Sequence, residues 1–374
     1  MRKHPAPPRT RLALASVLVG ALTAALATTS GTASADPRRG PVITVAADGS
    51  GDHTGLQAAV DAVPARSPER VTIRIEAGVY REPVVIPSDK PNITLLGATG
   101  DPRDVVVTYD RAAGTPKPGG GTYGTSGSAS VVISGDDVHV RDLTFENSFE
   151  RAEHPEITST QAVAVRTSGD RLVFENVRFL GHQDTLYANS PNADTPSRQY
   201  YRDCYVEGDV DFVFGRATAV FDGCEIRSLD RGSDTDNGYV TAPSTPPHQE
   251  FGFLFTDSCF TSDAPRGTVY LGRPWVPSSH PDANPQVLIR DSWLGSHLRR
   301  APGWVPMSSG TDWRGFRLEE YRNSGPGALV ADGRPQMGGE EAARHTARTY
   351  LAGADGWDPV RDTRGRTACT ARGR

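Results

Sequence analysis

A short phrase that recurs along the chain constrains its fold more than any other feature of the sequence. Six runs of seven residues alternate apolar and polar side chains, with Asp or Asn at the fourth position in five of them and Gly in the other. The copies begin at residues 139, 173, 200, 220, 254 and 288 (HVRDLTF, VFENVRF, YYRDCYV, VFDGCEI, LFTDSCF and LIRDSWL). Such alternation is typical of short β-strands, so the sequence predicts a fold of repeated strands.

The spacing of the copies distinguishes between repeat architectures. Successive copies start 34, 27, 20, 34 and 34 residues apart. A propeller blade needs four strands in about 40 to 50 residues, so the shorter steps argue against it. Coils of variable length suit a solenoid whose strands stack on those of the next coil. We therefore predict an all-β, single-domain, right-handed parallel β-helix.

A solenoid must close its open apolar end, and residues 55–63 have the pattern for this task. Leu56, Ala59, Val60 and Val63 fall at the i, i+3, i+4 and i+7 spacing of an amphipathic helix. We expect this helix to cap the N-terminal end of the β-helix.

The first 35 residues differ from the rest of the chain. Four basic residues precede an apolar stretch, and residues 33–35 (ASA) form a small-residue cleavage site. This pattern predicts a secretory signal peptide, with residues 36–374 as the mature domain. A membrane anchor would need about 20 predominantly apolar residues, whereas Ser16, Gly20 and Thr23 interrupt this stretch. We expect a secreted, extracellular protein with no membrane contact after cleavage.

Charge and motif content exclude several function classes. Arg and Lys are scattered and outnumbered by acids, 40 against 45, which disfavours a nucleic-acid partner. The nine His residues show no metal-ligand spacing, and no phosphate-binding loop, dinucleotide fingerprint or serine nucleophile elbow occurs. We expect no metal and no cofactor, so that any catalysis, such as a hydrolysis, would depend on carboxylates and hydrogen bonds.

Equal offsets from the repeated phrase predict which residues stack. Asp184 lies eight residues after Asn176, and Asp211 lies eight after Asp203. Adjacent coils would place these carboxylates about one strand spacing apart, ~4.8 Å at the backbone. Like charges that close separate their pKa values, which suits an acid and a nucleophile. The alternative for either residue alone is a turn or solvated ladder position.

The same argument concerns the cysteines. Cys204 and Cys224 occupy the fifth position of successive copies. We expect a disulfide between them, since export permits the bond, with a buried thiol ladder as the alternative. The pairing of Cys259 and Cys369 is not readable from the sequence.

Several separated motifs together resemble one family. They are residues 78–82 (GVYRE), 161–166 (QAVAVR), 181–187 (GHQDTLY), 211–215 (DFVFG) and 271–275 (LGRPW). In this order the chain is similar to pectin methylesterases (pectinesterases) of the bacterial secreted type, over about residues 43–298. The family fold is a right-handed parallel β-helix, in agreement with the prediction from the repeat. The last 70 or so residues resemble the family only loosely.

The resemblance implies roles for five polar residues. Asp211 would be the nucleophile that attacks the methyl ester of a galacturonate unit, and Asp184 would be the general acid and then the base. Gln161 and Gln183 would donate hydrogen bonds to the oxyanion. Arg273 would pair with Asp211 and keep it ionised.

The resemblance also implies a substrate groove for methyl-esterified homogalacturonan (pectin). Trp275 would present a flat face to a sugar ring. Four further groove residues are expected, each with a core or loop role as the alternative: Thr125, Phe214, Tyr187 and Val210. We expect a monomer.

One departure from the family pattern concerns the acids. Many members have Gly-Thr-Val before the nucleophile, whereas this chain has residues 208–210 (GDV). Asp209 adds a third acid, for which we expect a modulating effect on pH dependence.

Two other functions compete with an esterase. A glycoside hydrolase or lyase on the same fold would also use paired carboxylates, but oxyanion donors such as Gln161 and Gln183 serve acyl transfer. A catalytically silent carbohydrate-binding β-helix would have lost one of the five functional residues, and all five are present.

Overall fold

Each copy of the repeated phrase turns a corner at its fourth residue. The backbone φ is positive at all six of these positions, from 47° at Asp291 to 65° at Gly223. Asp, Asn and Gly are the residues that most readily adopt this left-handed region. The first half of each copy therefore belongs to one sheet and the second half to the next, which explains why the fourth position is restricted.

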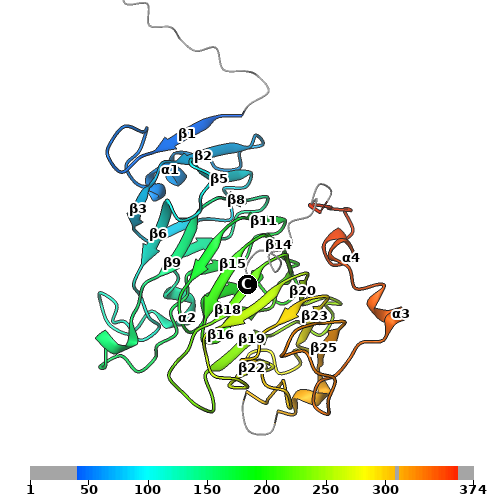
Figure 1. The fold of residues 1–374 in the computed structure, drawn as a ribbon. Coiled ribbons are helices and arrows are strands. Elements are labelled where there is room, and N and C mark those ends of the chain that lie inside the picture. Colours follow the sequence, from blue (N-terminus) through cyan, green and yellow to red (C-terminus); the bar gives the residue numbers. More distant parts are fainter. Residues whose placement is uncertain (1–39, 308–310, 361–374) are drawn as a thin grey trace, which may run out of the picture. The chain divides into compact units, whose positions relative to one another are not determined.

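The computed structural model describes residues 40–307 and 311–360, whose strands form three parallel sheets (Figure 1). The predicted signal peptide and Cys369 lie outside these residues. Sheet 1 contains, in order, β1 (Val42–Val45), β2 (Val71–Ile75), β5 (Ile93–Gly97), β8 (His139–Arg141), β11 (Leu172–Glu175), β14 (Arg198–Arg202), β17 (Thr218–Asp222), β20 (Phe253–Thr256), β23 (Gln286–Arg290) and β25 (Arg317–Tyr321).

The other two sheets follow the same order along the axis. Sheet 2 contains β3 (Gly78–Arg81), β6 (Val105–Tyr109), β9 (Thr144–Asn147), β12 (Arg178–Leu180), β15 (Tyr205–Gly208), β18 (Glu225–Ser228), β21 (Cys259–Ser262) and β24 (Trp293–Leu294). Sheet 3 contains β4 (Val84–Ile86), β7 (Val131–Ile133), β10 (Val165–Thr167), β13 (Leu186–Ala188), β16 (Val210–Gly215), β19 (Gly238–Pro243) and β22 (Val269–Gly272). The chain visits the sheets in turn, which confirms the predicted right-handed parallel β-helix.

The interior is a column of stacked side chains. The second residue of four successive copies is aromatic, and the rings stack coil on coil: Phe174 on Tyr201 at 4.7 Å, Tyr201 on Phe221 at 4.6 Å and Phe221 on Phe255 at 4.5 Å between centroids. All four are fully buried. Equal positions in the phrase therefore occupy equal positions in the coil.

The predicted cap is present as helix α1 (Leu56–Ala62), with Leu56, Ala59 and Val60 buried against β1, β2 and β4. Two of its N-terminal N–H groups, those of Leu56 and Gln57, donate to the Glu82 carboxylate just after β3, at 2.6 and 3.2 Å.

A segment without repeats covers the outer face of sheet 1. The outward residues Val173, Tyr200, Val220, Leu254 and Leu288 pack against residues 337–360, here called the C-terminal cover. This cover contains helices α3 (Gly339–Ala342) and α4 (Ala347–Ala352), from which Tyr350 and Leu351 are buried. The remaining short helices are α2 (Gly124–Gly127), η1 (Arg151–Glu153) and η2 (Trp313–Gly315).

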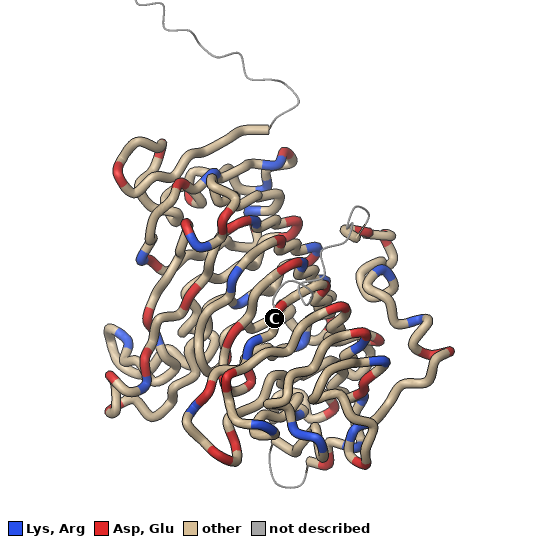
Figure 2. The backbone as a smooth tube through the Cα atoms, in the orientation of Figure 1, with Lys and Arg blue, Asp and Glu red and all other residues tan. Residues whose placement is uncertain are grey.

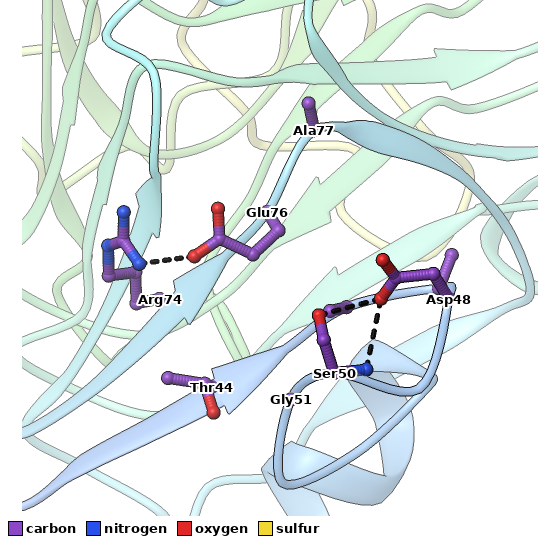
Figure 3. A pocket seen from close by; sticks show the side chains of 9 residues that line it. Thr44, Asp48, Ser50, Gly51, Arg74, Glu76 and Ala77 are labelled. Carbon is purple, nitrogen blue, oxygen red and sulfur yellow. Dashed lines mark hydrogen bonds and ion pairs between the residues drawn. The ribbon is translucent and has the colours of Figure 1, made fainter. Parts of the chain in front are cut away.

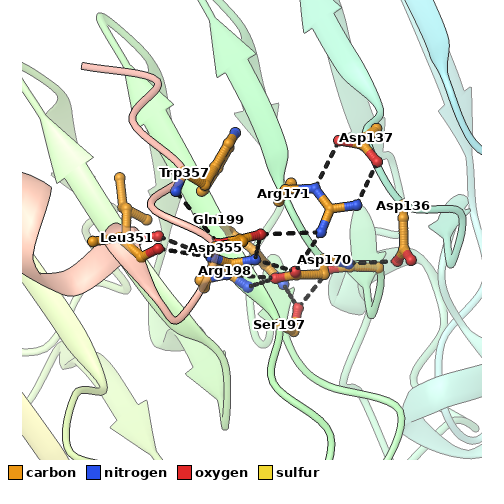
Figure 4. Close-up of polar contacts among 12 residues, drawn as sticks. Asp136, Asp137, Asp170, Arg171, Ser197, Arg198, Gln199, Leu351, Asp355 and Trp357 are labelled. Atoms are coloured by element: carbon orange, nitrogen blue, oxygen red, sulfur yellow. Dashed lines mark hydrogen bonds and ion pairs between the residues drawn. The ribbon is translucent and has the colours of Figure 1, made fainter. Parts of the chain in front are cut away.

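An ion-pair network ties the cover to the coils (Figure 4). The Arg198 guanidinium donates from Nε to Asp170 at 3.0 Å and from Nη2 to Asp355 of the cover at 2.9 Å. Arg171 joins the network through Asp170, to which its Nη1 donates at 3.2 Å, and its Nη2 also donates to Asp137 at 2.6 Å.

The predicted disulfide between Cys204 and Cys224 is wrong. Both are free, buried thiols on adjacent coils. Each sulfur is directed at a backbone carbonyl of the preceding coil, Cys204 Sγ at Phe174 O (3.4 Å) and Cys224 Sγ at Tyr201 O (3.3 Å). The two side chains lie on adjacent coils as predicted. Because both sulfurs point in the same direction along the column and not at each other, they form a ladder of thiols and no disulfide.

Charges on the described residues are interspersed, with Lys and Arg close to Asp and Glu along the coils (Figure 2). None of the helices within residues 40–307 and 311–360 is long and apolar enough to span a bilayer.

Candidate active site

Asp184 and Asp211 lie on adjacent coils at the outer face of sheet 3. Strand β13 pairs with β16, with Tyr187 opposite Phe214, and the Asp184 N–H donates to Val210 O at 3.0 Å. Both aspartates have a positive φ, 67° and 51°, and each is only 7% exposed. The backbone leaves regular strand geometry at both residues, which is common at functional sites. The predicted adjacency of the two acids is confirmed.

Arg273 follows β22 and reaches back to Asp211 across one coil. Its Nε and Nη2 donate to the two carboxylate oxygens at 2.8 and 2.7 Å. On its other side the guanidinium lies 3.9 Å from the centre of the Tyr239 ring, a cation–π contact. This bidentate, ring-supported geometry fixes the orientation of the Asp211 carboxylate.

Burial and charge separate the two acids. Burial, and next the nearby Asp211, raise the pKa of Asp184 well above its ordinary value. Burial also raises the pKa of Asp211, but the two hydrogen bonds from Arg273 oppose that rise. The pKa of Asp184 is therefore raised more strongly than that of Asp211, so a proton shared by the pair favours Asp184.

The two predicted oxyanion donors lie on neighbouring segments that are joined by a backbone hydrogen bond. Gln183 precedes Asp184, and its backbone carbonyl accepts from Ala162 N, the residue after Gln161, at 3.0 Å. The Gln183 Oε1 accepts from Thr160 Oγ1 at 3.2 Å, which leaves its NH2 group as the donor. Within the described residues, the buried Oε1 of Gln161 has no hydrogen-bond partner. An unpartnered buried acceptor of this kind costs free energy unless a donor from a ligand or water completes it.

An aromatic cluster extends from the acids along the outer face of sheet 3. The Tyr187 and Phe214 rings stack at 4.2 Å, and Trp275 lies 6.2 and 5.9 Å from them. These residues belong to a cluster separate from the interior core. The half-buried Trp275 is the most accessible of the three. This position on the outer face favours the predicted groove role over a role in the core.

The other two predicted groove residues, Val210 and Thr125, are placed by backbone hydrogen bonds of their segments. Val210 is 7% exposed and joins the acids through its carbonyl, which accepts from Asp184 N. Thr125 lies on α2, which docks through Ser128: the Ser128 Oγ accepts from Val163 N at 3.1 Å. Thr125 thus lies on a short helix that is held next to the segment of Gln161 to Val163.

The sequence analysis missed two contributions to the site. Tyr239 supports Arg273 from a strand without a recognised motif. Arg151, in a loop remote in sequence, forms an ion pair with Asp209. Asp209 could be noticed in the sequence because it lies two residues before Asp211, where many family members have Thr. Its partner Arg151 lies in no motif.

A surface pocket at the first coil is not this site (Figure 3). It is lined by residues around β1 and β2, and none of the predicted site residues is among them. Its polar groups are already paired: Asp48 accepts from Ser50 N and Oγ at 3.0 and 2.7 Å, and Arg74 pairs with Glu76. In the part of the chain that the structure describes, no group of three or more His, Cys, Asp or Glu side chains is arranged to hold a metal.

Comparison with known proteins agrees with this geometry. The family model for pectinesterases matches residues 42–354. The chain belongs to the pectinesterase family. Pectinesterases are carboxylic ester hydrolases. Pectinesterase 31 from Arabidopsis thaliana is 35% identical over 329 residues, which are 86% of this chain and 93% of that protein. A pectinesterase from Ralstonia nicotianae is 34% identical over 314 residues, 76% of this chain and 79% of that protein.

Solved pectinesterase structures share the fold. Pectin methylesterase PemA from Erwinia chrysanthemi superposes with a TM-score of 0.74 at 30% identity, over 86% of this chain and 98% of that one. A pectin methylesterase in complex with a hexasaccharide gives a TM-score of 0.76 at 30% identity, over 86% of this chain and 99% of that one. The family resemblance predicted from the motifs is confirmed.

Proposed function

We propose that this pectinesterase hydrolyses the methyl esters of homogalacturonan (pectin) and releases methanol and demethylated pectin. The observation that carries the proposal is a pair of buried acids of which only one, Asp211, is paired with an arginine, so that burial raises the pKa of Asp184 more strongly than that of Asp211. Asp211 accepts two hydrogen bonds from Arg273, and Asp184 beside it has a raised pKa. An ionised nucleophile next to a protonated acid is what acyl transfer from an ester requires.

The first half of the reaction uses both acids. A carboxylate oxygen of Asp211 attacks the ester carbonyl carbon and forms a tetrahedral intermediate. The bond from that carbon to the methoxy oxygen then breaks, and Asp184 gives its proton to the departing oxygen. Methanol leaves, and the galacturonyl group remains bound to Asp211 as an anhydride.

The second half restores the enzyme. A water oxygen attacks the same carbonyl carbon, and the Asp184 carboxylate takes a proton from this water. The bond to Asp211 breaks, so that Asp211 returns to its ionised form and Asp184 to its protonated form. The amide NH2 groups of Gln161 and Gln183 stabilise the oxyanion in both steps, at roughly 3 to 4 kcal/mol for a well-placed donor.

Substrate binding uses the open face of sheet 3. Trp275 packs against a sugar ring, Tyr187 and Phe214 support it, and Thr125 and Val210 border the groove. Relatives in complex with hexasaccharides support a carbohydrate chain as the ligand. We further propose that residues 1–35 are removed on export and that residues 36–374 act as an extracellular monomer in pectin catabolism and plant cell wall modification.

The test is methanol release from highly methylated pectin, with chain length and unsaturated ends followed in the same samples. We expect methanol with intact chains, and a loss of activity in Asp211→Asn. The control is Asp222→Asn, which makes the same change in sheet 1, where Asp222 accepts from the Tyr200 hydroxyl. Chain scission without methanol would favour a glycoside hydrolase or lyase, and no reaction by the folded protein would favour a silent binding protein.

A further inference from the structure

Asp209 is a buried carboxylate at the edge of the acid pair that the proposed reaction does not use. It is 1% exposed. Its Oδ1 accepts from Val210 N at 2.7 Å and from Arg151 Nη1 at 3.3 Å, and its Oδ2 contacts Arg151 Nη2. His182 Nδ1 and Arg231 Nε lie 3.6 and 3.9 Å from Oδ2. One carboxylate is thus surrounded by three basic side chains.

The three basic residues come from three different segments. Arg151 lies on η1, in the loop between β9 and β10; His182 lies in the turn between β12 and β13; Arg231 lies in the loop between β18 and β19. The backbone of Asp209 adds two links, because its N–H donates to His182 O at 3.1 Å and its carbonyl accepts from Tyr239 N at 3.0 Å. Asp209 therefore connects the coils on both sides of its own.

These links converge on the acids. His182 is two residues before Asp184, and Asp209 is two residues before Asp211. Both acids have a positive φ, a conformation that needs support from its surroundings. Val210, whose N–H is held by the Asp209 side chain, presents the carbonyl that accepts from Asp184 N.

We propose that Asp209 is a positioning residue for the acid pair: its buried carboxylate fastens the turn before Asp184 and the Arg151 loop to the strand of Asp211, and its charge acts on both acids. This inference rests on the proposed function, in which Asp184 and Asp211 react with the ester.

The charge of Asp209 is present throughout the working range of an enzyme. Burial alone would raise its pKa, but the contacts with His182 and Arg151 lower the pKa of Asp209 to about 2. The ionised Asp209 contributes to the raised pKa of both Asp184 and Asp211. In turn Asp209, and also Glu150 at 3.0 Å from Nε2, raise the pKa of His182. The charged groups that face Asp209 are thus Arg151, His182 and Arg231, with Glu150 behind His182.

A purely structural ion cluster would affect stability alone, so the pH profile separates the two roles. The acidic limb of kcat/KM reports ionisation of Asp211, and the alkaline limb reports loss of the proton from Asp184. In Asp209→Asn we expect both limbs to move to lower pH, by about half a unit. We also expect kcat to fall about tenfold or more, with little change in KM, because the acids lose their alignment while the aromatic groove is untouched.

Two further variants keep the inference testable even if Asp209→Asn folds poorly. In Arg151→Gln the charge of Asp209 is less compensated, so both limbs should move to higher pH. In the double variant the removed charges balance, and its limbs should lie nearer to wild type than those of either single variant. Asp222→Asn, in sheet 1, should leave the profile unchanged.

Limbs that stay at the wild-type positions in Asp209→Asn and Arg151→Gln, while only the melting temperature falls, would overturn the inference. Failure of the proposed function has a different signature, because the wild type would then release no methanol, or Asp211→Asn would retain methanol release, whatever the behaviour of Asp209.

Discussion

The outer faces of sheets 1 and 3 are built from the same coils but serve opposite purposes. On sheet 1 the outward residues are large and apolar, and the C-terminal cover buries them. On sheet 3 the outward residues include two aspartates, an aromatic cluster and the guanidinium of Arg273. A β-helix supplies its interior core by repetition, so each outer face is free to become either a packing surface or a site.

The two faces also differ in the regularity of their strands. The pairing of β16 with β19 shifts register between Val210 and Val213, around the positive φ of Asp211. The pairing of β17 with β14 and β20 on sheet 1 continues without a shift. Irregular backbone therefore coincides with the proposed active site and regular backbone with the covered face. Four experiments test this division.

The largest effect is expected for Asp184→Asn. Loss of the acid and base should lower kcat by about 10² to 10⁴-fold. Because the folded state raises the pKa of Asp184 above its ordinary 3.8, the wild type loses stability as pH rises through that raised value. The variant lacks this decline. Methanol release and melting curves over a pH series check both points, and an unchanged kcat would contradict the assignment of the acid.

The second change removes part of the cover. Leu351 is fully buried against the outer face of sheet 1. Leu351→Ala should destabilise the fold by about 2 to 5 kcal/mol, through lost transfer free energy and a cavity. Chemical denaturation measures the loss. Since the proposed active site lies on sheet 3, kcat/KM at a temperature where the variant is folded should equal that of the wild type; a changed KM for pectin would break the comparison.

The third test compares the same substitution at two half-buried tryptophans, one on each face. Trp275 lies against the sheet 3 cluster and Trp357 against the sheet 1 cluster. Trp275→Ala should raise KM about tenfold, which corresponds to about 1.4 kcal/mol of binding. Trp357→Ala should lower the melting temperature and leave KM unchanged. The same effect on KM in both variants would show that neither face is specialised for substrate.

The smallest effect is expected for Asp355→Asn, in the network of Figure 4. Arg198 lowers the pKa of Asp355, so its contribution to stability is present above the ordinary carboxyl value and is lost as pH falls. The Asp355 side chain is 46% exposed. Screening by solvent should keep the loss below about 1 kcal/mol, and added salt should reduce it further. A loss of several kcal/mol would mean that the network, rather than apolar packing, holds the cover.

Much of the fold could be predicted because the repeat is local. The fourth residue of each copy adopts a left-handed turn that few residue types tolerate, and the second residue faces the interior column. Equal offsets from the phrase then placed Asp184 and Asp211 on adjacent coils. The same offsets placed Cys204 beside Cys224 but did not determine whether a bond forms, because side-chain direction within the column decides that.

The sequence by itself therefore determined the coil, the cap and the pair of acids, because strand alternation and turn chemistry act within a few residues. Only the tertiary structure decided which outer face is covered and which partners surround the acids. The cover has no repeat, and Arg151 meets Asp209 across 58 positions of the chain. Contacts of that separation depend on how whole loops pack, which no short pattern of residues encodes.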